Sequence, residues 1–257
     1  MKALIYAGPK QAEVREVAEP QAVEGAVKIA VKYCGVCGSD IGIFLGTHPR
    51  AKAPLIFGHE FLGVVEEDGK KFKKGDRVVT YPLLSCGHCR ACREGNKHVC
   101  NTLGLIGIAL LACGAEKVYI SDIFEKRLAL AKELGMIPVN PNKESLKDIV
   151  LEGTDGEGCD VLFECSGSPS AAIEMTEITR VRGRICMTAV HKKPHEVDLR
   201  QLNFKEQLLI GTRVYTQEEF GQAIRFTEDI QEQLEKVVSH VVPLSESPKV
   251  FDMIADP

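Results

Sequence analysis

The sequence predicts an α/β protein in two parts, a β-rich first part followed by a parallel sheet flanked by helices. Short apolar alternations fill the first hundred residues, whereas buried strands alternate with amphipathic helices after Ile108. Hydrophobic residues make up 44% and charged residues 26% of the 257, which is typical of a globular protein of one large or two small domains.

The first part is predicted to be all-β because apolar and polar residues alternate along short runs. Glycine, proline and charged pairs such as Lys73-Lys74, which precede Gly75, separate these runs and are typical of turns. The expected strands lie at residues 2–6, 27–31, 61–65 and 77–81.

The second part is predicted to form a parallel sheet, because its strands are separated by helices. A helical stretch from Ile108 precedes a buried strand at 117–121 and a helix at 125–134, which Gly135 closes. Further helices are expected at 146–151, 171–179, 218–227 and 247–255, and further strands at 159–165, 183–188 and 237–242.

Charge and hydropathy exclude several classes of partner. The net charge of −4 argues against an extended nucleic-acid or anionic-membrane surface, and no apolar run is long enough for a membrane helix. The chain begins MKALIYAGPK, without an apolar signal segment, so a cytoplasmic protein with small-molecule partners is expected. In a reducing cytosol, clustered cysteines are more often metal ligands than crosslinks.

Four cysteines at turn-forming spacings, CxxCxxCx7C, predict a structural zinc site. These are Cys86, Cys89, Cys92 and Cys100. Four thiolates close a tetrahedral shell and leave no position for a substrate. Four unrelated thiols or an iron–sulfur cluster are the weaker alternatives.

A second group of residues suits a catalytic zinc. Cys37 and His59 offer one thiolate and one imidazole, and Glu60 adds a carboxylate. Ser39 is placed to take a proton from an alcohol, and Asp40 beside it is a plausible partner for a ligand. A lone cysteine and histidine are more often structural, so the hydroxyl is what favours a catalytic role.

The runs YCGVCGSD, FGHEFLGVV and KKGDRVV, followed by the four-cysteine segment, resemble the zinc-containing medium-chain alcohol dehydrogenases, in particular the sorbitol, threonine and butanediol dehydrogenase branch. The resemblance implies a chaperonin-10-like domain, here residues 1–107, and a Rossmann domain, here residues 108–257. It implies that Cys37 and His59 hold the catalytic zinc, that Ser39 begins a proton relay and that Glu60 lies near the metal. It also implies a homo-oligomer.

The cofactor residues are expected in the second part. Asp122 follows a strand, where an acid that binds the adenosine ribose favours NAD over NADP. Arg127 is expected near the adenosine edge, and Gly167 near the nicotinamide. Of the family's GxGxxG fingerprint only the second half survives, as Gly104 and Gly107.

Relative to the family that it resembles, the chain lacks a segment between the cysteines and this fingerprint. In the family this segment contains the first Rossmann strand and supplies the third zinc ligand. Only six residues lie between Gly107 and Gly114, whereas a crossover needs ten or more. The parallel sheet is therefore expected to be incomplete. Either the protein lacks the segment, or the sequence joins two stretches of a longer chain.

The sequence thus predicts a zinc-dependent oxidoreductase that oxidises a secondary alcohol, a polyol or an amino alcohol with NAD. It would hold one catalytic and one structural zinc ion. The alternative is a non-catalytic, zinc-stabilised remnant or interaction protein of the same family. A zinc-ribbon nucleic-acid binder is disfavoured by the negative charge.

Overall fold

The computed structural model describes residues 1–21, 23, 25–48, 51–82, 103–191, 193–212 and 215–255. The chain divides into two compact units, Met1–Leu84 together with His240–Pro257, and Ser85–Ser239. The C-terminal residues thus group with the first unit. The sequence-based division, with one boundary after residue 107, places them in the second part. No helix in the described ranges combines the length and apolarity needed to cross a bilayer.

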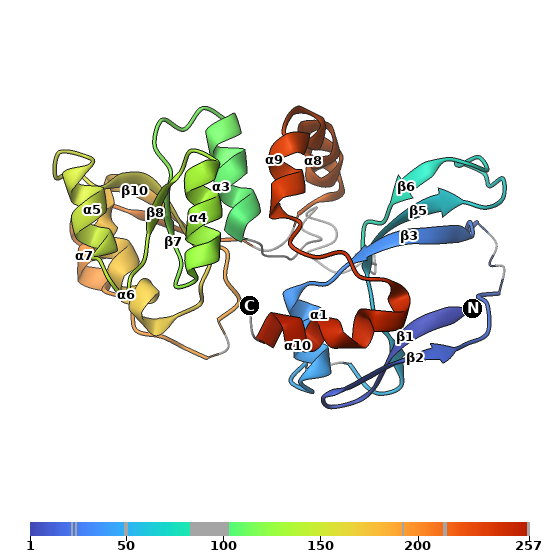
Figure 1. Ribbon diagram of the computed structural model, residues 1–257. Coiled ribbons are helices and arrows are strands. Elements are labelled where there is room, and N and C mark those ends of the chain that lie inside the picture. The colour runs from blue at the N-terminus through green and yellow to red at the C-terminus, as the bar shows by residue number, and fades with distance from the viewer. Residues whose placement is uncertain are drawn as a thin grey trace. The chain divides into compact units, whose positions relative to one another are not determined.

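The first unit contains two small antiparallel sheets (Figure 1). One has the order β2-β1-β4, from Gln11–Glu16, Lys2–Gly8 and Leu55–Ile56. The other has the order β3-β5-β6, from Ile29–Gly35, Glu60–Val65 and Arg77–Val79. Its helical segments are α1 (Gly38–Phe44), a 3-10 helix (Leu244–Lys249) and α10 (Val250–Ala255).

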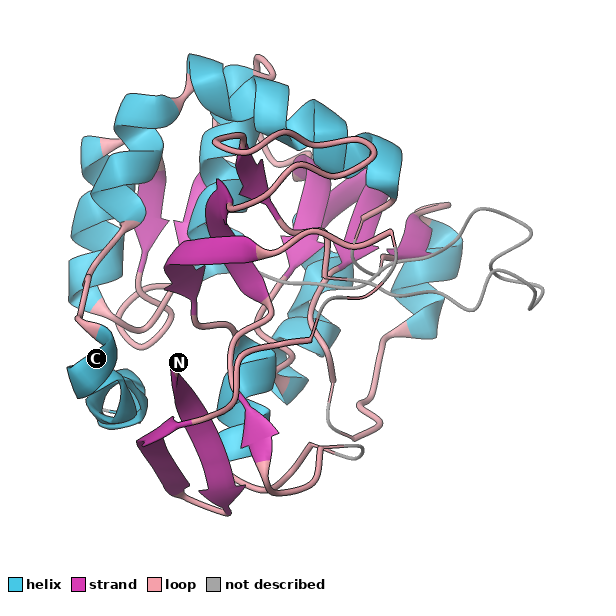
Figure 2. Ribbon diagram, turned by 90° about the vertical axis from the view of Figure 1, so that its right-hand side faces the viewer, coloured by secondary structure: helices cyan, strands magenta, loops and turns pink. Residues whose placement is uncertain are grey.

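The second unit alternates strands and helices, and its strands are flanked by helices (Figure 2). The strands are β7 (Tyr119–Ser121), β8 (Ile137–Val139), β9 (Cys159–Glu164), β10 (Thr179–Met187) and β11 (Leu208–Gly211). The helices are α3 (Leu103–Ala112), α4 (Glu125–Glu133), α5 (Leu146–Glu152), α6 (Pro169–Ile178), α7 (Leu199–Phe204), α8 (Gln217–Asp229) and α9 (Gln231–Val237). Every strand pair is parallel.

These strands form two sheets, β7-β8 and β11-β10-β9. A doubly wound sheet has the strand order 3-2-1-4-5-6. In that order β8 and β7 correspond to the third and second strands, and β9, β10 and β11 to the fourth, fifth and sixth. The first, central strand has no counterpart among the described residues.

Gly107 allows α3 to pack closely on β7. A Cβ atom at this position would come within 2.6 Å of the Met136 sulfur and 3.0 Å of the Ile120 Cδ1 atom. Beside it, Ile108 is buried in a cluster with Val118 before β7, Ala131 of α4, Met136 before β8 and Ile230 before α9. Gly107 therefore serves the contact between helix and strand.

Several elements differ from the sequence-based expectation. The first part was expected to be all-β, but α1 is a helix within it, and β2, β4, α7 and α9 were not predicted. Residues 237–242 were expected to form a strand, but α9 extends to Val237 and no regular element follows until Leu244. Leu234 and Val237 pack on the cluster around Ile108, and helical spacing places both on that core. The short strands β8 and β11 were not predicted.

Candidate active site

The site in the first unit is built where α1 follows β3 and where β5 begins. Cys37 precedes α1, and its backbone N–H donates to the Asp40 carboxylate at 3.0 Å, which closes the first turn of the helix. His59 precedes β5. Gly58 has φ +96°, and a Cβ there would lie 2.6 Å from the Cys34 sulfur, so only glycine lets the chain pass Cys34 and bring His59 to α1.

The structure brings Cys37, Ser39 and His59 together. The Cys37 Sγ atom lies 3.2 Å from His59 Nε2, and Ser39 Oγ lies 2.7 Å from that sulfur and 3.1 Å from that nitrogen. Cys37 and Ser39 come from the start of one helix, whereas His59 is about twenty residues further on. One thiol, one imidazole and one hydroxyl therefore converge on a single point.

Asp40 completes this group beside Nδ1 of the histidine ring. Its carboxyl is 2% exposed, and Oδ1 lies 3.3 Å from His59 Nδ1. That contact is not aligned as a hydrogen bond, so Oδ1 has no hydrogen-bond partner among the described residues. Candidate ligand atoms of Cys37, Asp40 and His59 lie within 4.8 Å of one another. A buried carboxylate oxygen without a donor beside a thiol and an imidazole fits a site for a divalent cation such as zinc.

The two ring nitrogens of His59 face different partners. Nε2 faces Cys37 and Ser39, and Nδ1 faces Asp40. A carboxylate at one nitrogen fixes the orientation and tautomer of a histidine that binds metal through the other. This geometry suits Cys37 and His59 as ligands, with Asp40 as a buried negative charge beside the ring.

Glu60 is not one of the three described residues whose candidate ligand atoms lie within 4.8 Å of one another. It begins β5 and pairs with Gly35 of β3, and its Oε2 atom lies 3.5 Å from where a Gly35 Cβ would be. The four cysteines expected to hold the structural zinc, Cys86, Cys89, Cys92 and Cys100, lie outside the described residues.

Burial raises the pKa of the Cys37 thiol to about 11, although the Ser39 hydroxyl acts in the opposite direction. The free thiol is therefore protonated at neutral pH and must lose its proton to bind a metal ion. We expect zinc binding at this site to release a proton from Cys37 and its affinity to rise about tenfold per pH unit between pH 7 and 9. Calorimetry in buffers of different ionisation enthalpy measures this proton, and a Cys37→Ser chain that releases equally many protons would contradict the expectation.

In the second unit Asp122 follows β7, and Arg127 lies in α4. The Asp122 carboxylate accepts from the Phe124 backbone N–H at 2.9 Å and from the Arg127 guanidinium at 3.2 Å. The guanidinium also lies over the Phe124 ring, 4.7 Å from its centre. Asp122 and Arg127 are thus adjacent at the carboxyl end of β7. Gly104 lies in the first turn of α3.

Gly167 lies in the loop between β9 and α6, with φ +66°. Its N–H donates to Glu164 at 2.9 Å, and its Cβ position would be 3.5 Å from Ala189. Glu164 is 3% exposed, and its other carboxylate oxygen lies 3.0 Å from His191 Nε2. The Glu164 carboxylate therefore contacts both the loop that follows β9, at Gly167, and the loop that follows β10, at His191. Sequence reasoning missed this acid, although its place at the end of a buried strand, before Ser166-Gly167, was a usable signal.

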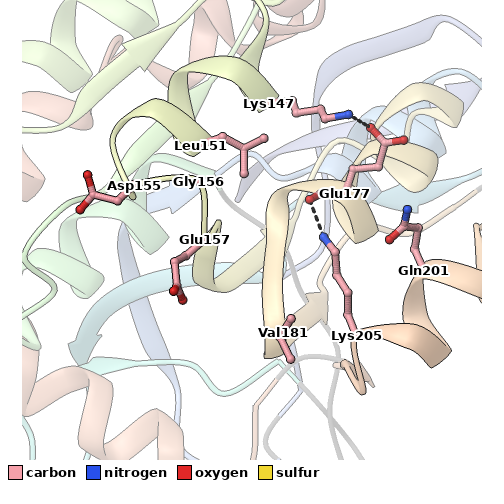
Figure 3. A pocket seen from close by; sticks show the side chains of 9 residues that line it. All are labelled: Lys147, Leu151, Asp155, Gly156, Glu157, Glu177, Val181, Gln201 and Lys205. Carbon is pink, nitrogen blue, oxygen red and sulfur yellow. Dashed lines mark hydrogen bonds and ion pairs between the residues drawn. The ribbon is translucent and has the colours of Figure 1, made fainter.

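A cavity of about 630 Å³ in the second unit contains none of the predicted site residues (Figure 3). Lys205 from its wall donates to the backbone carbonyls of Thr176, Glu177 and Thr179 at the end of α6. Burial lowers the pKa of this lysine. Lys147 forms an ion pair with the Glu177 carboxylate at 2.8 Å. Both lysines of the cavity are thus engaged in holding α6.

Zinc-dependent dehydrogenases combine a cysteine–histidine group in a β-rich unit with a following unit of parallel strands and helices. Family models agree: the alcohol dehydrogenase GroES-like domain matches residues 23–124, and the zinc-binding dehydrogenase matches residues 102–229. The chain belongs to the zinc-type medium-chain alcohol dehydrogenase family.

Individual relatives support this assignment. The chain is 32% identical to 2-dehydro-3-deoxy-L-galactonate 5-dehydrogenase of Pseudoalteromonas atlantica, over 98% of this chain and 94% of that protein. It is 27% identical to L-threonine 3-dehydrogenase of Proteus mirabilis, over 93% of this chain and 92% of that protein. The first alignment spans 324 positions against 257 residues, so at least 67 positions of the relative have no counterpart here.

The fold is that of solved dehydrogenases. The structure of 2R,3R-butanediol dehydrogenase from Bacillus subtilis superposes with a TM-score of 0.86 at 24% identity, covering 99% of this chain and 96% of that one. An alcohol dehydrogenase from Thermotoga maritima gives 0.88 at 20% identity with the same coverage. The expected GroES-like and Rossmann-type fold is therefore confirmed.

Proposed function

We propose that this chain oxidises a secondary alcohol, a polyol or an amino alcohol by hydride transfer to NAD. The observation that carries the proposal is the convergence of Cys37 Sγ and His59 Nε2 at 3.2 Å, with the Ser39 hydroxyl in contact with both. A hydride would leave the carbinol carbon for C4 of the nicotinamide, and the hydroxyl proton would leave through Ser39.

Each residue of the site has a distinct part in this reaction. Cys37 and His59 would hold the catalytic zinc ion, which supplies Lewis-acid polarisation of the alcohol oxygen. Ser39 Oγ would accept the hydroxyl proton, because its hydroxyl contacts both of these side chains. Asp40 would place a buried negative charge beside His59 Nδ1 and so help to balance the charge of the ion. The four cysteines from Cys86 to Cys100 would hold a second, structural ion, and Glu60 stays a proposed acid near the catalytic ion that can join its ligands.

NAD is proposed as the cofactor because the Asp122 carboxylate, at the end of β7, disfavours a 2′-phosphate. Arg127 already pairs with Asp122, so its charge is partly engaged rather than free for such a phosphate. Gly104 and Gly107 would lie near the pyrophosphate and Gly167 near the nicotinamide. The homo-oligomer and the cytoplasmic location stay predictions.

The names of the relatives suggest which alcohols to test first. One is a 5-dehydrogenase of a deoxygalactonate, and the other is a 3-dehydrogenase of threonine. Both names describe oxidation of a secondary hydroxyl in a molecule that also carries a carboxylate. Hydroxy acids with a secondary alcohol are therefore the first candidates, followed by vicinal diols and polyols.

A substrate screen tests the proposal. Purified, zinc-loaded protein is incubated with hydroxy acids, polyols, diols and amino alcohols, each with NAD and with NADP, and formation of the reduced cofactor is followed at about 340 nm. We expect a secondary alcohol to be oxidised with NAD and the rate to fall at least about 100-fold in Ser39→Ala. Zinc bound at Cys37 without turnover of any alcohol would favour the non-catalytic alternative.

Asp40 provides a further prediction. We expect Asp40→Asn to weaken metal binding at the Cys37 site by about 10- to 100-fold, because the amide carries no charge to balance the cation. Competition with a chromophoric chelator measures this affinity. Asp76→Asn is the matched control: that carboxylate also accepts a backbone N–H, from Lys73, but lies in another turn. Equal losses in both variants would show that the effect is general destabilisation.

A further inference from the structure

The two segments that carry the candidate metal ligands each contain a phenylalanine. Phe44 is the last residue of α1, the helix that Cys37 precedes. Phe57 stands two residues before His59. Its ring meets Tyr6 of β1 edge to face, with centroids 5.8 Å apart, and its N–H donates to Leu4.

One side chain from the C-terminal helix contacts both of these rings. Phe251 of α10 is 5% exposed and stacks on Phe44, with centroids 4.2 Å apart and an interplanar angle of 4°. Its centroid also lies 5.0 Å from that of Phe57, at 44°. Nearly two hundred residues separate Phe251 from His59 in the chain, yet the ring joins the two segments that hold the ligands.

This contact matters because α1 is short. It has seven residues, of which only Asp40 is buried, and an isolated helix of this length is not stable in water. Its direction therefore depends on what holds its two ends. Asp40 holds the beginning, and at the end Phe44 stacks on Phe251 while its carbonyl accepts the Lys10 N–H.

We propose that Phe251 is a positioning residue for the Cys37–His59 metal site, and that the C-terminal segment is thereby part of the site's support. Phe251 keeps the end of α1 and the segment before His59 at a fixed separation, which sets the distance between the two ligands. The inference rests on the proposed metal site. The Phe251 ring does not contact the reacting groups, so it would affect the reaction only by fixing the positions of the metal ligands.

Cobalt(II) binding tests the role without requiring turnover. The part of the Co(II) absorption that disappears in Cys37→Ser reports this site alone. We expect Phe251→Leu to weaken Co(II) affinity at this site at least about tenfold and to change the intensity of its visible bands, because the coordination geometry loosens. Ile254→Ala, in the same helix but 36% exposed, is the matched control and should leave both unchanged.

Phe44→Leu removes the same stack from the other side and is expected to weaken Co(II) binding similarly. The double variant should then lose little more than either single variant. A Phe251→Leu chain that melts at a lower temperature but keeps the wild-type Co(II) affinity and spectrum would overturn the positioning role. If that variant does not fold, wild-type Co(II) affinity and spectrum in Phe44→Leu would overturn it instead. A wild-type chain without any Cys37-dependent absorption would instead overturn the proposed metal site, and the positioning role with it.

Discussion

Replacing His59 by alanine or Cys37 by serine is expected to lower dehydrogenase activity by at least about 1,000-fold and to remove one metal ion per chain. The two side chains supply the only thiol and imidazole in the candidate metal group of the described residues. Without either, the remaining donors cannot hold a divalent ion at neutral pH, and polarisation of the alcohol is lost.

Cys34→Ser is the control for this experiment. Its sulfur lies on β3, three residues before Cys37, where it contacts the Gly35 carbonyl rather than the donor group. We expect this variant to keep its metal content and most of its activity. Metal analysis by mass spectrometry and initial rates measure both quantities. Full metal content in His59→Ala would contradict the assignment of this residue as a ligand.

The second large effect concerns the cofactor. The comparison is with a chimera in which the segment that only the P. atlantica relative has is inserted into this chain. We expect this chain to bind NADH at least about 100-fold more weakly than the chimera does. The strands of the second unit form two separate sheets, and the central strand between β7 and β9 is absent from the described residues. In a doubly wound sheet the dinucleotide binds at that place, with its pyrophosphate at the following helix.

The magnitude follows from the hydrogen bonds that would be lost. A bond from a backbone N–H to a charged phosphate contributes about 1.5 to 3 kcal/mol, so losing two weakens binding by roughly 10²- to 10⁴-fold. NADH fluorescence titration of both proteins measures the ratio. A chimera with the same segment in scrambled order is the control, and equal, micromolar affinity of the natural chain and the chimera would contradict the expectation.

Much of the fold could be predicted because burial has a simple sequence pattern. The run at 159–165 has three consecutive apolar residues, Val161 to Phe163, and contains no glycine or proline, and β9 lies there. The short strands were harder. β8 contains Pro138, which speaks against a strand, and the expected strand at 237–242 fails because Val237 packs on a core that only the folded chain creates.

The candidate site shows the same division. Residue type and spacing single out Cys37, Ser39 and His59, and the structure brings them together. Phe251 carries no such signal, because an apolar residue in a terminal helix is ordinary and its contact with Phe44 exists only in three dimensions.

The most direct test of the account is anomalous diffraction at the zinc absorption edge on crystals of the zinc-loaded protein. The account predicts a peak about 2.3 Å from Cys37 Sγ and about 2.0 to 2.1 Å from His59 Nε2. A well-ordered map in which the same two side chains bind no zinc, or in which they point to different ions, would contradict it.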